Sequence, residues 1–244
     1  MENLPVYIPV LFVLTTVAAL LLLYWTIKGS GSEMVRNKAN VICFGLILWL
    51  GFQAILAFRN VYHSDPDAMP PKIILFGIAP AILLILLLFL TAKGRSFMDG
   101  LPLDRLIWIH VLRVPVELVL FWLFIQQLVP ELMTFEGRNF DVFSGITAPL
   151  IAWFGFRKRK LSSGFILIWN FVCLGLLINI VVHALLSAPS PFQKLAFDQP
   201  NIAILYFPFH WLPTFIVPLV LFAQLSSIRQ LLLPEDNKSY PLTY

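Results

Sequence analysis

Charged residues are scarce in this sequence. Asp, Glu, Lys and Arg together make up 12% of its 244 residues, whereas hydrophobic residues make up 59%. A soluble domain carries about twice that share of charge, so an ordinary soluble fold is excluded. We therefore expect a membrane-embedded chain whose partners are the lipid bilayer and a small molecule. The net charge of +4 is explained by membrane orientation, as argued below, and no nucleic-acid partner is expected.

Cysteines are equally scarce. Cys43 and Cys173 lie inside two different apolar runs, so no disulfide is expected between them. Neither has a second cysteine at the spacing of metal ligands, and both are interpreted as packing residues. The sequence also lacks an internal repeat of the kind found in transporters with two related halves. Residues 1–244 are therefore predicted to form a single membrane domain.

Long apolar runs dominate what remains. A hydrocarbon core about 30 Å thick needs about 20 apolar residues in a helix. Continuous apolar runs of this length exclude the alternating pattern of a membrane barrel, so each run should be a helix. The sequence predicts an all-α integral membrane protein, a seven-transmembrane-helix bundle with helices at about 6–27, 40–58, 73–91, 106–129, 141–156, 165–187 and 202–228.

Basic residues indicate how this bundle is oriented. They gather after the first, third, fifth and seventh runs, at Lys28, Arg36, Lys38, Lys93, Arg95, Arg105, the run Arg157 to Lys160, Arg229 and Lys238. Cytoplasmic loops carry such an excess, which places the N-terminus outside and the C-terminus in the cytoplasm. We expect a multi-pass protein of the plasma membrane, or of the cytoplasmic membrane in a bacterium.

Polar residues inside the runs are the best indicators of function, because a charged group at the centre of a membrane helix costs at least about 2.5 kcal/mol. The fourth run contains His110, Arg113 and Glu117, which are spaced by three and four residues and share one helix face. We predict an ion pair between Arg113 and Glu117, with Pro115 between them freeing the carbonyl of Val111. The pair either fixes the helix register or opens to meet a ligand, proton or ion.

The sixth and seventh runs supply more polar groups. Asn179 and His183 are four residues apart, as are His210 and Thr214, and their estimated depths place them with Glu117 at mid-depth or in the outer half. We predict a pocket that opens to the outside and is closed toward the cytoplasm. Its predicted ligand-binding residues are Arg113, Glu117, Asn179, His183, His210 and Thr214.

A polar segment precedes the fifth run. Residues 134–141 alternate in charge at the entrance to a helix. In the simpler interpretation the segment is a polar turn in which Asp141 caps the helix. In the other it forms an outer lid over the pocket, with Glu136, Arg138 and Asp141 facing the ligand.

A metal site is an alternative use of the same groups. Zinc binds imidazole nitrogens and carboxylate oxygens, which His183, His210 and Glu117 would supply. These residues come from three helices and lack the local H-x-x-x-H spacing of stronger metal motifs. Haem is a further alternative, with His183 and His210 as axial ligands.

Three functions remain open at this stage. The first is a receptor-like or carrier-like protein that binds a small molecule, of lipophilic character if the pocket walls are aromatic. The second is a membrane enzyme that uses a metal or haem, with Glu117 as ligand or general base. The third is a structural or accessory subunit whose buried polar groups only specify helix packing.

Overall fold

The computed structural model describes residues 4–233 and confirms the all-α prediction. Lys238, which contributed to the predicted orientation, lies outside the described residues. The helices are α1 (Tyr7–Lys28), α2 (Glu33–Arg36), α3 (Ala39–Phe58), α4 (Ala79–Leu90), α5 (Ala92–Asp99), α6 (Leu103–Trp108), α7 (Arg113–Ile125), α8 (Val142–Ala152), α9 (Ser163–Ser187) and α10 (Val217–Leu232). Turns of π-helix at Ile74–Ile78, Trp153–Arg157 and Leu212–Ile216 extend α4, α8 and α10, and a 3-10 turn at Ile109–Leu112 joins α6 to α7.

Five helical segments among the described residues are long and apolar enough to cross a bilayer. They are Tyr7–Lys28, Glu33–Phe58, Leu103–Ile125, Ser163–Ser187 and Leu212–Leu232. A sixth is counted if the bent pair Ile74–Leu90 and Ala92–Asp99 is one span. The remaining predicted span corresponds to a shorter apolar helix at Val142–Arg157, so the count of seven stays a prediction.

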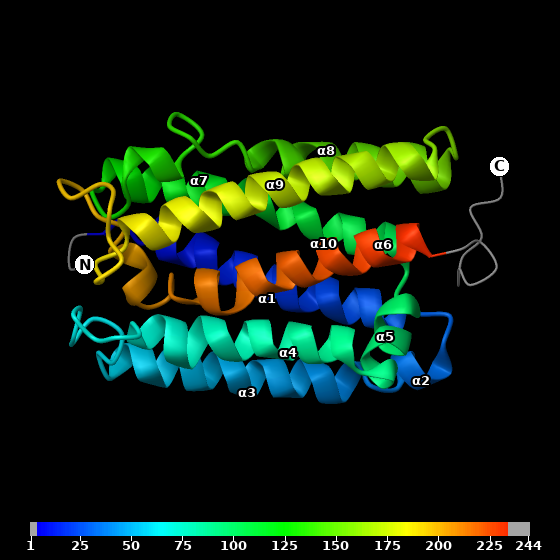
Figure 1. Cartoon of the computed structure of the whole chain (residues 1–244), viewed down its shortest axis with the longest axis horizontal. Coiled ribbons are helices and arrows are strands. Elements are labelled where there is room, and N and C mark those ends of the chain that lie inside the picture. The colour runs from blue at the N-terminus through cyan, green and yellow to red at the C-terminus, as the bar shows by residue number, and fades with distance from the viewer. Residues whose placement is uncertain (1–3, 234–244) are drawn as a thin grey trace.

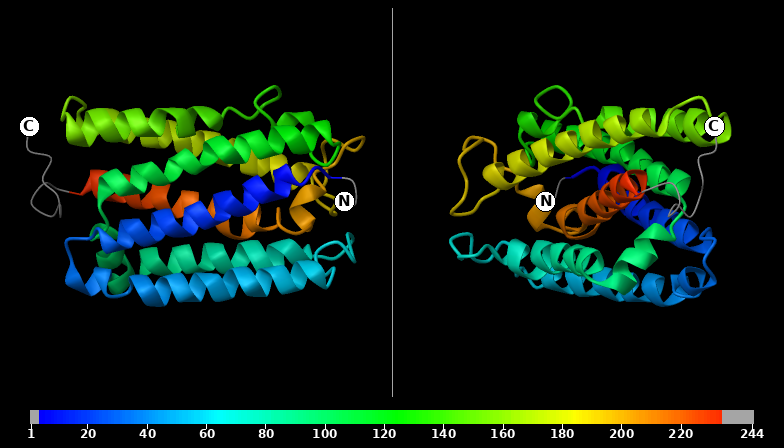
Figure 2. Two further views of the ribbon diagram at one scale, coloured as in Figure 1. Left: turned by 180° about the vertical axis from the view of Figure 1, so that it is seen from behind. Right: turned by 45° about the vertical axis from the view of Figure 1, so that its right-hand side comes forward.

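The helices lie lengthwise in three layers (Figure 1). α3 and α4 form one outer layer, α1 and α10 lie in the middle, and α8 and α9 lie on the opposite side, as the view from behind also shows (Figure 2). α1, α4, α8 and α10 run in one direction, and α3, α6–α7 and α9 run in the other. The ends of α1 and α10 and the short helices α2 and α5 therefore meet at one end of the bundle, here called the basic end because most of the basic residues lie there.

The layers differ in how deeply they are buried. Within the most apolar stretch of each span, 67% of the residues are buried in the α10 segment but only 17% in the α3 segment. Membrane helices that pack on all sides bury most of their surface against other helices. α3 therefore lies at the edge of the bundle, with most of its surface free of protein contacts.

Proline residues create the points at which α3 is attached. Proline has no N–H, so Pro80 and Pro218 cannot donate to the carbonyls four residues earlier in their helices. Two side chains of α3 use those carbonyls as acceptors. Gln53 Nε2 donates to the carbonyl of Phe76 at 2.9 Å, and Trp49 Nε1 donates to that of Thr214 at 3.0 Å.

Tyr62 reinforces this attachment from the loop that follows α3. Its hydroxyl donates to Oε1 of Gln53, the side chain that also reaches the carbonyl of Phe76. Burial raises the pKa of Tyr62, so the hydroxyl keeps its proton and remains a donor. The half of α3 nearer this loop is therefore held by a chain of hydrogen bonds.

A sharp bend separates α4 from α5. The two helices meet at 91°, and Thr91 between them caps α5 by accepting a hydrogen bond from the backbone N–H of Gly94 at 3.1 Å. A side chain at Gly94 would collide with the backbone of Leu88, so this close turn requires glycine. The bend directs α5 across the basic end of the bundle.

Candidate functional site

Arg113 is the centre of a polar network inside the bundle. It lies at the start of α7, is 3% exposed, and forms an ion pair with Asp141. The guanidinium also donates to the carbonyl of Cys173 at 3.2 Å and to Oε1 of Gln224 at 3.1 Å. A buried charge is tolerated when it is paired and hydrogen-bonded, and here Nε is the guanidinium nitrogen without a partner among the described residues. Arg113 thus joins α7, α9, α10 and the residue before α8.

Gln224 extends the network to the basic half of α9. Its amide nitrogen donates to the backbone carbonyl of Asn170 at 2.6 Å and to the side-chain oxygen of the same residue at 2.9 Å. Asn170 in turn donates to the carbonyl of Ile166 at 2.9 Å. Gln224 and Asn170 are both fully buried, so these hydrogen bonds connect helices and contact no solvent.

The predicted ion pair between Arg113 and Glu117 is wrong, because Arg113 pairs with Asp141 instead. Glu117 accepts a hydrogen bond from the side-chain amide of Asn139, which also donates to the carbonyl of Met133 at 3.0 Å. Residues 126–141 form a largely non-helical segment whose buried end carries Asn139 and Asp141. This segment supplies the partners of both Glu117 and Arg113. Its path could not be predicted from helix periodicity, because most of it is not helical.

Asp141 occupies the N-cap position of α8, but its side chain caps no backbone N–H there. The side chain is buried against Arg113 and is not exposed as a surface lid would require. Glu136 and Arg138 do lie exposed on the same segment. Asn179 donates to the backbone carbonyl of Arg138 at 2.9 Å and so ties the segment to α9. A lid function for Glu136 and Arg138 stays a prediction.

The structure does not assemble the predicted metal site. No group of three or more His, Cys, Asp or Glu side chains suited to a metal ion occurs within residues 4–233. His183 Nδ1 lies 2.8 Å from the carbonyl of Asn179 in its own helix. His210 is fully buried elsewhere, with its ring centroid 5.4 Å from that of Trp211 and 6.0 Å from that of Tyr62. Glu117, the third predicted ligand, contacts Asn139.

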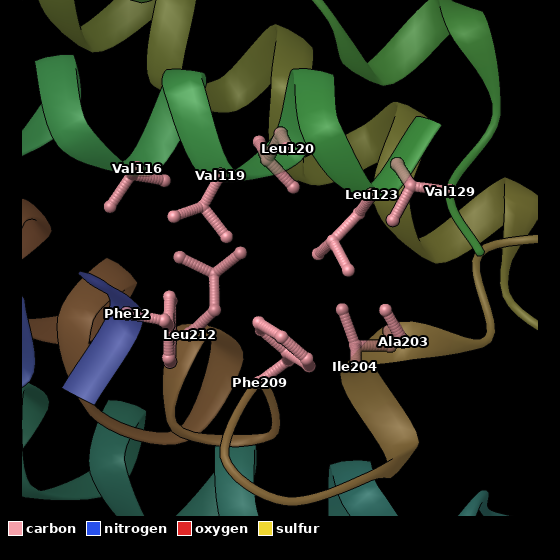
Figure 3. Close-up of a pocket in the computed structure, with 10 residues that line it drawn as sticks. All are labelled: Phe12, Val116, Val119, Leu120, Leu123, Val129, Ala203, Ile204, Phe209 and Leu212. Carbon is pink, nitrogen blue, oxygen red and sulfur yellow. The ribbon is translucent and has the colours of Figure 1, made fainter. Parts of the chain in front are cut away.

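A small apolar cavity lies between α7 and the segment before α10. Figure 3 shows side chains of α7 facing Phe12 of α1 and the segment before α10. The cavity between them has a volume of about 10 Å³, close to the minimum that holds one water molecule. Its lining residues are Phe12, Val116, Val119, Leu120, Leu123, Val129, Ala203, Ile204, Phe209 and Leu212. Glu117 and His210 are not among them, so they do not share this cavity.

A much larger cavity lies on the other side of α10, with a volume of about 740 Å³. Here it is called the crevice, and its walls come from α1, α3, α4, α5, α10 and the turn before α10. Leu46 of α3, Leu84 of α4 and Phe222 of α10 represent its apolar lining. Thr214 also lines it, and is the one predicted ligand-binding residue that does so.

The two ends of the crevice differ in charge. At one end its lining includes Trp49 and Thr214, which are joined by the hydrogen bond from Trp49 to the Thr214 carbonyl. At the basic end its lining includes Lys38, just before α3, and Lys93 in α5. Eleven residues separate Lys38 from Trp49, which corresponds to about 17 Å along a helix. The cavity is therefore long, apolar and positively charged at one end.

Sequence reasoning missed the crevice because its walls are ordinary apolar residues. One signal was present: Gly45, Pro80 and Gly94 are small or helix-interrupting residues inside or beside membrane runs, and all three line the cavity. Such residues leave space or bend helices, but they do so in many helices without forming a cavity. Their positions alone therefore could not identify the site.

Residues 70–232 match the model of a family described as a domain of unknown function (DUF8737). The chain belongs to this DUF8737 family. No curated protein and no solved structure matches it. The matched part of this DUF8737 protein contains α4 to α10, and with them the whole Arg113 network. The α1 and α3 walls of the crevice precede the matched residues.

Proposed function

We propose that this DUF8737 protein is a receptor-like or carrier-like membrane protein that binds a lipophilic small molecule in the crevice. The observation that carries the proposal is an apolar cavity of about 740 Å³ inside a bundle of membrane helices. Ligand pockets have volumes of about 300–1,000 Å³ and are lined mainly by apolar side chains with a few polar groups. Here those polar groups are Thr91, Thr214 and the two lysines.

The same proposal includes seven membrane passes with the N-terminus outside. Its support is the alternating direction of the helices and the path of residues 126–157. α8 and its π-helical turn cover only 16 residues, and the non-helical segment before them continues lengthwise beside α9. Non-helical backbone at membrane depth is tolerated where protein buries it. Thr134, Asn139 and Asp141 of this segment are buried accordingly.

The proposed ligand is lipophilic, as expected from the sequence. Its proposed site, however, is the crevice and not the polar residues of α7 and α9. Arg113, Gln224 and Asn170 satisfy one another inside the bundle. Groups engaged in this way hold helices together. A purely structural function is the second candidate, and the closed Arg113 network is the observation that favours it.

Fluorescence of Trp49 can test ligand binding, because this residue lines the crevice. The probe is dodecyl maltoside with a brominated chain, which quenches indole fluorescence on contact. The protein has seven tryptophans, so the Trp49 signal is taken as the difference between the wild type and Trp49→Phe. We expect the brominated chain to quench this signal.

Two glycines of α3 provide a matched pair of variants. Gly45 lines the crevice and Gly51 does not, and a side chain built at either position meets no atom within 4 Å. Gly45→Phe should fill the crevice and reduce quenching of Trp49, whereas Gly51→Phe should leave the quenching unchanged. Equal quenching in both variants would show that the probe reaches Trp49 from the lipid side, and the proposal would fail.

A further inference from the structure

Two lysines at the basic end of the crevice have no ion-pair partner within residues 4–233. Lys38 and Lys93 are exposed, and within residues 4–233 neither has a carboxylate within ion-pair distance. All other groups that line the cavity are neutral. The mouth of an apolar cavity therefore carries two positive charges that no carboxylate of the described part of the chain balances.

Nearby arginines differ because the protein engages each of them. Arg95 donates to the carbonyls of Phe89 and Leu90 at 3.1 and 2.9 Å. Arg105 donates to the carbonyl of Trp25 at 2.5 Å, and Arg229 pairs with Asp99 at 2.8 Å. These arginines stabilise the ends of helices. The charges of Lys38 and Lys93 remain available for a ligand.

The bend between α4 and α5 fixes one of the two lysines at this place. Thr91 and Gly94 hold the turn through the cap and the close approach to Leu88 described above. Lys93 lies between these two residues, on the helix that crosses the basic end. A rigid element thus presents its charge to the crevice.

We infer that the crevice binds an anionic phospholipid from the leaflet at the basic end, with an acyl chain inside and the phosphate at Lys38 and Lys93. The inference rests on the proposed function and specifies the ligand. Charge complementarity requires an anion at the mouth, and the apolar walls require a hydrocarbon chain behind it. Basic pockets between membrane helices on the cytoplasmic side are a known form of anionic-lipid recognition. A lysine ammonium suits phosphate as a point charge.

Quenching of Trp49 by lipids with brominated acyl chains tests the inference. Phosphatidylglycerol and phosphatidylcholine with the same chains are titrated separately into the detergent-solubilised protein. We expect half-maximal quenching at a lower concentration of the anionic lipid. Lys38→Gln and Lys93→Gln should each weaken binding of phosphatidylglycerol about fivefold and leave that of phosphatidylcholine unchanged.

Lys28→Gln is the matched control. Lys28 lies at the same end of the bundle but over the ring of Tyr24, and it does not line the crevice. Its replacement should not change the lipid preference. If Lys28→Gln weakened phosphatidylglycerol binding as much as the other two variants, the effect would be one of general surface charge and the inference would be overturned.

Two further outcomes separate the inference from the proposed function. Equal quenching by both lipids would overturn the anionic headgroup while the crevice remained a binding site. If neither lipid nor brominated dodecyl maltoside quenched Trp49, the proposal that the crevice is a binding site would be overturned. Inorganic phosphate at millimolar concentration should not displace phosphatidylglycerol, and displacement would indicate a site for a soluble anion instead.

Discussion

α10 separates two regions of opposite character. On one side Gln224 reaches into the Arg113 network, whose hydrogen bonds and ion pair join α7, α9, α10 and the residue before α8. On the other side Phe222 faces the crevice, whose walls are apolar and do not meet. The first region holds the charged and amide groups that a sequence reader selects as functional. In the function proposed above, these groups hold helices together, and the ligand binds among ordinary apolar residues.

Two glycines, one in each region, show how tightly the helices pack there. A side chain at Gly145 of α8 would collide with Val114 and approach Arg113, so α8 packs tightly on α7 beside the network. A Cβ added at Gly45 of α3 would meet no atom within 4 Å. The network therefore lies in a closely packed interface, whereas the crevice wall at Gly45 has room for an added carbon atom.

The largest expected effect comes from removing the central charge. Arg113→Leu leaves Asp141 buried without its partner, and we expect a loss of about 3–5 kcal/mol in the free energy of unfolding. The measurement is reversible denaturation in detergent. Arg229→Leu removes a partly exposed pair with Asp99 and should cost about 1 kcal/mol.

The double variant Arg113→Leu with Asp141→Leu makes this prediction specific. Removing both charges should restore part of the lost stability, because no buried charge is left unpaired. Strictly additive losses would show that Arg113 and Asp141 do not stabilise one another. The interpretation of the network as a set of mutually stabilising buried groups would then be wrong.

The two glycines give an intermediate effect of opposite sign. Gly145→Ala should destabilise the protein by about 1–3 kcal/mol, since α8 must move away from α7. Gly45→Ala should be neutral or stabilising by up to about 1 kcal/mol, because alanine favours a helix and nothing obstructs it. Thermal unfolding of both variants in one detergent is the measurement. Similar losses in the two would mean that the crevice is packed as tightly as the network.

The smallest expected effect concerns the end of the crevice at Trp49 and Thr214. Trp49→Phe removes the hydrogen bond to the carbonyl of Thr214 and should cost about 1 kcal/mol. Amide hydrogen exchange should then increase in the half of α3 that faces the crevice. Trp211→Phe, which removes a bond to the carbonyl of Leu50, is the matched control and should leave exchange near Lys38 unchanged.

Sequence reasoning selected several of the buried polar residues correctly but assigned Arg113 the wrong partner. Arg113, Glu117 and His210 are buried as expected for polar groups inside membrane runs. The residues that they contact depend on how each helix is rotated about its axis and on the path of residues 126–141. That segment has no helical repeat of apolar residues from which its path could be predicted. Asp141, expected at a helix end, is paired with Arg113 for that reason.

The sequence by itself determined that the chain is helical and suited to a membrane, because apolar runs of this length must satisfy their own backbone hydrogen bonds in lipid. It also determined where the basic end lies, because most basic residues lie in the segments after alternate runs. Only the tertiary structure decided which polar groups meet and which helices stand apart. Both depend on the distances and rotations between helices, which are set by many weak contacts between residues far apart in the chain, and the crevice between α3 and α10 exists only through them.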